Sequence, residues 1–158
     1  MERKQLLKLI EKEIQNARAK TALLVENLTT GEGLVSYCAD IPVVSASMIK
    51  VPVMITALEE IQAGSLSKHM LIPVDSSLIL EDTEVFEYGE KSYTLDELLV
   101  WMIINSDSTA TNCLINLLSM ERINRTCKRL GLKNTRLERL MLDFNAIKNG
   151  YNNYTSAF

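Results

Sequence analysis

Residues 45–54 read Ser-Ala-Ser-Met-Ile-Lys-Val-Pro-Val-Met, with a serine and a lysine three positions apart at the start of a long apolar run. Positions i and i+3 share one face of a helix. A helix that begins near Ser47 would therefore direct the Ser47 hydroxyl and the Lys50 ammonium into one cleft. Its N-terminus would add unpaired backbone N–H groups and positive potential, which suit an oxyanion. The spacing predicts a serine nucleophile with a lysine base.

The surroundings of Lys50 distinguish this pair from a second one in the chain. A lysine acts as a base only where burial or a nearby cation disfavours its charged form, and apolar residues flank Lys50 on both sides. Ser65 and Lys68 have the same spacing, which a chain of this composition contains about once by chance. They follow Gly64 in a polar connection. We interpret Ser65 as a turn residue and Lys68 as solvated.

Ser106, Asp107 and Ser108 lie at a break between two apolar helical runs, where side chains can reach a cleft. One interpretation is structural: Ser106 or Asp107 caps the following helix, which contributes about 1 kcal/mol. The other interpretation is functional. In it, Ser106 relays a proton between Lys50 and a leaving group, and Ser108 hydrogen-bonds the substrate and Lys50. The residues alone leave both interpretations open.

Length and composition predict one globular domain, residues 1–158, with 47% hydrophobic and 23% charged residues. A net charge of −3 argues against a nucleic-acid or acidic-membrane surface. No stretch approaches the roughly 18 consecutive apolar residues of a membrane span. The N-terminus begins with an amphipathic pattern rather than a signal peptide. The localisation is therefore cytoplasmic as the sequence stands, and extracytoplasmic if a leader has been removed.

The three cysteines, Cys38, Cys113 and Cys127, cannot all pair internally, and two of them lie in apolar helical stretches. Buried, reduced thiols are therefore favoured over a disulfide. The single histidine, His69, lies in a connection and is expected at the surface, so a Ser-His-Asp triad is not expected. No cysteine or histidine cluster has the spacing of metal ligands. We expect neither a metal nor another cofactor.

The hydrophobic periodicity predicts an α+β fold dominated by helix, with an N-terminal helix, a β-hairpin and then an all-helical block. The first helix includes the apolar positions from Leu6 to Ala17, and the hairpin strands are expected at 21–27 and 33–38. Further helices are predicted at 47–63, 98–104, 109–118, 121–130 and 143–149, with short extended pieces between residues 65 and 92. A capping box at residues 94–97 and glycines at helix ends support these limits.

Two segments resemble motifs of class A β-lactamases. Residues 45–54 are similar to the nucleophile segment of that family, and residues 103–114, Ile-Ile-Asn-Ser-Asp-Ser-Thr-Ala-Thr-Asn-Cys-Leu, resemble its Ser-Asp-Asn segment. Residues 135–139, Thr-Arg-Leu-Glu-Arg, precede an irregular loop as in the family, and residues 153–157 are similar to the segment that follows that loop. Order and spacing agree through nearly the whole chain. It is identified as resembling the penicillin-recognising serine hydrolases.

The resemblance implies a role for each matching residue. Ser47 would be the acylated nucleophile, Lys50 the base or proton shuttle and Ser106 the relay hydroxyl, with the Ser47 N–H as half of an oxyanion hole. Ser108 takes the place of the asparagine of Ser-Asp-Asn, and Asn145 matches an asparagine of the loop, so both would contact substrate. The implied substrate is a β-lactam or a peptidoglycan-like peptide, bound without a cofactor.

The chain also departs from the family at three places. Ser108 is shorter than asparagine and lacks its amide, which predicts weaker substrate positioning. Met141 stands where class A enzymes carry the glutamate that activates the deacylating water. A thioether cannot accept a proton, so if neither Glu138 nor Asp143 substitutes, an acyl-enzyme would form and persist, as in a penicillin-binding protein. The third departure is that the sequence ends at Phe158, before the strands that carry the Lys-Thr/Ser-Gly motif.

We therefore expect a partial β-lactamase/transpeptidase-like fold whose hairpin keeps an unpaired edge. Either a second copy, a complementing chain or an altered local fold covers that surface, or these 158 residues are cut from a longer protein. The first functional hypothesis is a β-lactamase-like serine hydrolase, weak or inactive in this truncated form. The second is a non-catalytic relative that serves binding or assembly. A third, an unrelated helical regulatory domain, predicts that the Ser47, Lys50 and Ser106 side chains do not converge.

Overall fold

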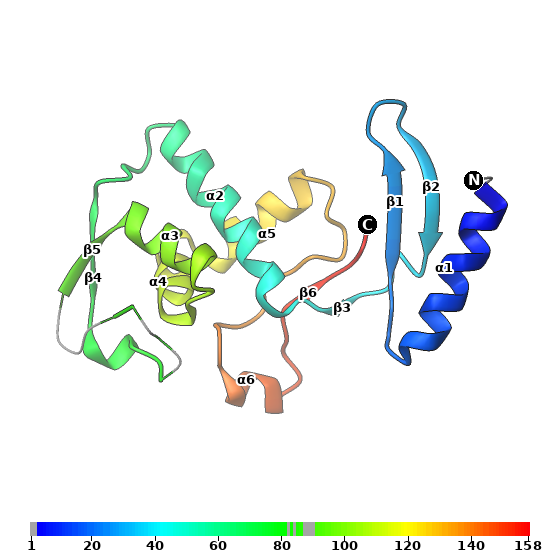
Figure 1. The fold of residues 1–158 in the computed structure, drawn as a ribbon. Helices are drawn as coiled ribbons and strands as arrows, with labels where there is room; N and C mark the ends of the chain where they lie inside the picture. The colour runs from blue at the N-terminus through cyan, green and yellow to red at the C-terminus, as the bar shows by residue number, and fades with distance from the viewer. Residues whose placement is uncertain (1–2, 82, 84, 87–90) are drawn as a thin grey trace.

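The chain begins with a helix that lies beside a β-hairpin (Figure 1). A computed structural model describes residues 3–81, 83, 85–86 and 91–158, and its first elements are α1 (Arg3–Ala17), β1 (Leu23–Asn27) and β2 (Glu32–Tyr37). The two strands pair antiparallel. Asn27 closes the turn between them, because its Oδ1 accepts from Thr29 N at 2.9 Å and from Thr30 N at 3.2 Å. The predicted helix and hairpin are confirmed.

The rest of the chain is mainly helical, and this confirms the predicted helix-dominated α+β class. Its helices and strands are β3 (Val43–Val44), η1 (Ala46–Ile49), α2 (Lys50–Gln62), β4 (Leu71–Val74), η2 (Ser76–Leu78), β5 (Lys91–Thr94), α3 (Leu95–Ile104), α4 (Ser108–Leu118), α5 (Met120–Arg129), α6 (Phe144–Lys148) and β6 (Tyr154–Thr155). The described strands form three antiparallel pairs: β1 with β2, β3 with β6 and β4 with β5.

Local sequence signals set several of these limits. At the start of α3, Thr94 Oγ1 accepts from Glu97 N and the Glu97 carboxylate accepts from Thr94 N at 2.7 Å, which is the predicted capping box. The α5 helix ends before Gly131, whose φ of +78° is a left-handed conformation that glycine adopts without strain. These short-range contacts explain why the helix boundaries follow the sequence closely.

The helices α2, α3, α4 and α5 pack around one apolar core. Its fully buried side chains include Ile49, Val53, Leu95, Leu98, Met102, Leu114, Ile115 and Ile123. At one side of the core, Phe86, Tyr93 and Trp101 meet edge to face with ring centroids 5.0–5.1 Å apart. Trp101 and Met102 are thus core residues, which is the simpler account of the apolar run before Ser106.

Two features differ from the sequence-based expectation. The helix expected at 47–63 begins as the 3₁₀ turn η1, in which Lys50 N–H donates to Ser47 O, three residues back. Such turns are frequent at helix N-termini, where the i−4 acceptors of an α-helix are missing. The second difference is Cys38, which is exposed at the end of β2, whereas Cys113 and Cys127 are buried. All three thiols are free, as predicted.

The hairpin stands apart from the helical block in Figure 1, and the short pair of β3 and β6 lies between them. The C-terminus contacts the connection between β2 and β3, where Phe158 N–H donates to Ala39 O at 3.1 Å. Within the described residues, no helix has the length and apolar character needed to cross a membrane. The site discussed below lies where α2 begins and where α3 ends.

Candidate active site

Ser47 and Lys50 are brought together by the 3₁₀ turn that precedes α2. In a 3₁₀ helix, side chains at i and i+3 are eclipsed rather than offset. The Ser47 hydroxyl is exposed, whereas Lys50 is only 3% exposed, and Lys50 Nζ lies 3.5 Å from Ser47 Oγ. The departure from a regular α-helix therefore places the amine directly beneath the hydroxyl.

Ser106 joins this pair from the connection between α3 and α4. Its Oγ lies 3.0 Å from Ser47 Oγ and 2.9 Å from Lys50 Nζ. Lys50 Nζ also donates to the Ser106 carbonyl oxygen. We call Ser47, Lys50 and Ser106 the nucleophile cluster. Its convergence is the opposite of what an unrelated helical domain with chance motifs predicts.

The backbone is strained on both sides of the cluster. Ala46, directly before Ser47, has φ +45°, and Ser106 itself has φ +54°. Non-glycine residues in this left-handed region cost about 1 kcal/mol or more each and concentrate at functional sites. In this conformation, both the carbonyl oxygen and the hydroxyl oxygen of Ser106 accept hydrogen bonds from Lys50 Nζ.

Asp107 fits the structural interpretation of residues 106–108, and Ser106 has the contacts that the functional interpretation expects. The buried Asp107 caps α4, since its Oδ1 accepts from Ala110 N at 2.7 Å, and its Oδ2 accepts from the Thr83 hydroxyl. Capping is thus the work of Asp107. Ser106, which the sequence allowed as an alternative cap, instead contacts Lys50 and Ser47.

The two expected substrate-binding residues are placed differently. Ser108 is the first residue of α4 and is buried. Asn145 lies in α6, is exposed, and contributes its carbonyl oxygen to hydrogen bonds from Asn149. Among the hydrogen bonds described here, none links Asn145 to the nucleophile cluster. Their roles toward substrate remain predictions.

The segment from Arg136 to Asp143, called here the 136–143 loop, is held by three asparagine side chains. Asn124 of α5 bonds Leu137 twice, accepting from its N and donating to its O, both at 2.8 Å. Asn112 of α4 does the same for Met141, at 2.7 and 3.2 Å. Each side-chain amide thus replaces a strand partner for one loop residue, which fixes irregular backbone that would otherwise lack hydrogen bonds.

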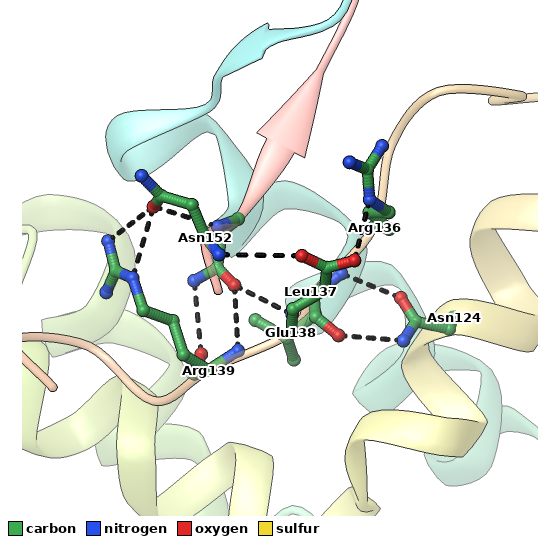
Figure 2. A network of polar contacts seen from close by, with 7 residues as sticks. Asn124, Arg136, Leu137, Glu138, Arg139 and Asn152 are labelled. Carbon is green, nitrogen blue, oxygen red and sulfur yellow. Dashed lines mark hydrogen bonds and ion pairs between the residues drawn. The ribbon is translucent and has the colours of Figure 1, made fainter. Parts of the chain in front are cut away.

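The third asparagine, Asn153, is buried and binds the middle of the loop. Its Oδ1 accepts from Glu138 N at 2.9 Å and Arg139 N at 3.1 Å, and its Nδ2 donates to Arg139 O. Around it, Asn152 Oδ1 accepts from the Arg139 guanidinium at 2.9 and 3.1 Å, as Figure 2 shows. Since Asn153 O also accepts from Ser45 N, the same residue connects the loop to the segment before Ser47.

The two carboxylates that lie close in sequence to Met141, those of Glu138 and Asp143, both accept hydrogen bonds from other parts of the chain. Glu138 accepts from Arg136 Nε at 2.8 Å and from Asn152 N at 3.4 Å (Figure 2). Asp143 caps α6 through a 2.9 Å bond from Ala146 N. Met141 is half-buried and packs against the core. The loop therefore presents a thioether where the family resemblance places a glutamate.

Sequence reasoning did not find the asparagines that hold this loop. Asn112 and Asn124 lie inside helices, where a polar residue usually faces solvent, and both are partly buried instead. Asn112 stands between Thr111 and Cys113, which are buried, and this is the signal that points to an inward amide. The neighbouring sequence does not indicate its partner, which is a loop residue 29 positions later in the chain.

The buried thiols carry no reactive character. Burial, and then the negative charge of Asp107, raise the pKa of Cys113 to about 11, and burial also raises the pKa of Cys127. The thiolate is the nucleophilic form of cysteine, and a raised pKa disfavours it in both residues. Across the part of the chain that the structure describes, no group of three or more His, Cys, Asp or Glu is placed to hold a metal ion.

The profile of the beta-lactamase enzyme family matches residues 3–158. No curated protein matches the chain at a significant level. Among solved structures, a β-lactamase from Chitinophaga pinensis DSM 2588 is 20% identical, with a TM-score of 0.82 over 95% of this chain and 57% of that one. An ancestral class A β-lactamase is 21% identical, with a TM-score of 0.82 over 99% and 60% of the two chains.

A mutant of PBP-A in an acyl-enzyme complex with penicillin G is 24% identical, with a TM-score of 0.83 over 98% of this chain and 58% of that one. At these identities the likeness concerns the fold. The chain spans about three fifths of the length of these structures, and the predicted partial β-lactamase fold is confirmed.

Proposed function

The chain belongs to the beta-lactamase enzyme family, and we propose that it reacts through Ser47 with a β-lactam or a peptidoglycan-like peptide and retains the acyl group. The observation that carries this proposal is the nucleophile cluster: the Ser47 hydroxyl has Lys50 Nζ at 3.5 Å and Ser106 Oγ at 3.0 Å. A nucleophile, a base and a second proton carrier within hydrogen-bonding reach are what acyl transfer requires.

Acylation follows from these positions. The step requires Lys50 in its neutral form, which takes the proton of the Ser47 hydroxyl as Oγ bonds to the substrate carbonyl carbon. The tetrahedral intermediate then breaks its C–N bond, and the leaving nitrogen takes a proton from Ser106 Oγ. Lys50 returns its proton to Ser106. The product is an ester on Ser47, and Ser106 and Lys50 are back in their starting protonation states. Backbone N–H groups at the helix start suit the transient oxyanion.

Deacylation lacks an equivalent group. A hydrolytic water needs a general base within hydrogen-bonding distance, and the loop position expected to supply it is Met141. Glu138 and Asp143 hold Arg136 and the α6 N-terminus instead. The ester on Ser47 is therefore expected to be long-lived, so the chain would behave as a penicillin-binding protein rather than as a rapid β-lactamase.

A non-catalytic binding or assembly role is the second candidate. It is favoured by the burial of Ser108, the residue that stands in for a substrate-binding asparagine. A buried and shortened side chain offers a ligand less than an exposed amide does. Under this hypothesis the nucleophile cluster persists as part of the framework, and Ser47 does not acquire an acyl group.

Intact-mass spectrometry after incubation with penicillin G separates the two. We expect one added penicillin per chain that persists for hours, is absent in Ser47→Ala and is retained in Ser65→Ala, the serine of the second Ser-x-x-Lys pair. Circular dichroism would check that both variants keep the helical fold. An adduct that survives Ser47→Ala would contradict the proposal, and a wild-type chain that gains no mass would leave the non-catalytic role.

A further inference from the structure

Asn149 and Gly150 form the one Asn-Gly dipeptide of the sequence. The side-chain amide carbon of an asparagine can be attacked by the backbone nitrogen of the next residue. A side chain on that next residue hinders the approach, and glycine has none. Every other asparagine of the chain precedes a residue that carries a side chain. The sequence therefore singles out Asn149 as the asparagine most open to this attack.

The structure places this dipeptide where the short helix α6 ends. Asn149 directly follows Lys148, the last residue of α6, and both Asn149 and Gly150 are exposed. Gly150 has φ +87°, in the left-handed region that glycine adopts without strain. A Cβ added at Gly150 would meet nothing within 4 Å. Solvent and a moving backbone nitrogen thus have room around the Asn149 amide.

Two hydrogen bonds hold the reacting atoms while α6 is closed. Asn149 Nδ2, the leaving nitrogen, donates to Asn145 O at 3.0 Å. The Gly150 N–H, the attacking nitrogen, donates to Ile147 O at 3.0 Å. The reaction therefore needs the end of α6 to open. A five-residue helix has little stability of its own, and helix ends open more easily than the packed core.

We propose that Asn149 is a site of spontaneous deamidation whose rate is set by the opening of α6. The Gly150 nitrogen loses its proton and bonds to Asn149 Cγ. The Cγ–Nδ2 bond then breaks, and the nitrogen takes up a proton and leaves as ammonia. Water opens the resulting succinimide ring at one of its two carbonyls and gives aspartate or isoaspartate. No oxidant or reductant takes part.

The product changes the contacts that close α6. A carboxylate at position 149 cannot donate to Asn145 O, and it adds a negative charge at the helix C-terminus, where the partial charge is already negative. Deamidation should therefore loosen α6, the element that carries Asn145. The inference concerns this chain without any substrate, so it stands apart from the acylation proposed above.

Peptide mapping by mass spectrometry tests the site in the full chain, incubated warm in a mildly alkaline buffer without β-lactam. We expect a gain of one mass unit at Asn149, and none at this position in Asn149→Gln, whose longer side chain must close a larger ring. Asp143→Ala removes the N-cap of α6 and should speed the reaction roughly fivefold, the factor that loss of an N-cap adds to helix opening. Thr94→Ala removes the cap of α3 instead and should react like wild type.

Two results would overturn the proposal. One is a folded chain in which Asn149 stays unchanged while the urea-denatured chain converts, and the other is equal rates in Asp143→Ala and Thr94→Ala. Hydrogen exchange examines the consequence: the amides of residues 149–151 should exchange faster in Asn149→Asp than in wild type, and unchanged exchange would contradict a loosened α6. Circular dichroism verifies that each variant keeps the helical fold.

Discussion

The nucleophile cluster and the 136–143 loop both contain irregular backbone with polar side chains around it. The hydrogen-bonding partners of these side chains differ between the two regions. In the cluster, Lys50 is directed at two hydroxyls and a carbonyl, and Ser47 is exposed. In the loop, amides are directed at the backbone itself, as Asn112 is at Met141. Under the proposed function, the cluster carries the chemistry and the amides of the loop fix its backbone.

This difference separates the two halves of an acyl-transfer cycle. Under the proposed function, forming an ester uses the groups of the cluster, whereas hydrolysing the ester would need a base on the loop. The loop retains its framework, with Asn124 and Asn153 holding its backbone, yet carries Met141 at the expected base position. The hydrogen bonds that hold the loop backbone therefore do not depend on a glutamate at position 141. Four experiments examine this contrast, from the largest expected effect to the smallest.

Replacing the base should have the largest effect. Lys50→Met keeps an unbranched side chain of similar length but removes the proton acceptor, so we expect acylation of Ser47 by penicillin to slow by roughly 10³-fold. Time-resolved intact-mass spectrometry measures the rate. Lys68→Met, in the exposed second pair, is the control and should stay within about twofold of wild type. Equal rates in both variants would remove Lys50 from the mechanism.

Adding a base at position 141 should allow the loop to promote hydrolysis of the ester on Ser47. Met141→Glu places a carboxylate at the position from which a water would be activated, and we expect the acyl-enzyme lifetime to fall by about 10²-fold. The decay of the penicillin adduct after removal of free drug reports this. Met141→Gln has nearly the same shape but accepts no proton, so its adduct should persist. A long-lived adduct in both variants would show that the loop does not face the ester.

Removing a loop contact should affect stability rather than chemistry. Asn153→Ala removes the buried side chain that accepts from the N–H groups of Glu138 and Arg139, which should cost about 2 kcal/mol of unfolding free energy. Asn145→Ala is the control, because that residue is exposed and bonds through its carbonyl, and it should change stability by less than about 0.5 kcal/mol. Urea unfolding measures both, and equal midpoints would contradict the assigned role.

Cys113 of α4 lines a pocket together with Met141, and the charge of Asp107 acts on its thiol. Because burial raises its pKa from 9.0 to about 11, the folded chain keeps the thiol proton at pH values where the unfolded chain has released it. This stabilisation is complete below pH 9 and is lost as the pH rises toward 11. We expect it to amount to about 2–3 kcal/mol.

Urea unfolding between pH 8 and 11 tests this effect of Cys113. The wild type should lose stability more steeply than Cys113→Ala, whose lower stability at every pH is a separate cavity cost. Parallel pH profiles for the two proteins would contradict the assignment. Cys38 offers a check on the native state, since its exposed thiol should react with a maleimide while the buried thiols do not.

Several parts of the fold could be read from short stretches of sequence. The capping box at Thr94, the stop at Gly131 and the amphipathic first helix depend on contacts within a few residues, and the structure agrees with each. The start of α2 was less predictable. A 3₁₀ turn and an α-helix place the same residues on one face, so the apolar pattern could not distinguish them.

The sequence by itself determined which groups are available: a serine and a lysine one turn apart, a second serine at a helix break, and a methionine where a base would stand. Only the tertiary structure decided that Ser106 reaches Lys50 across 56 positions and that amides hold the loop. Spacing along a chain fixes neighbours within a turn of helix, whereas contacts between distant segments depend on how whole helices pack.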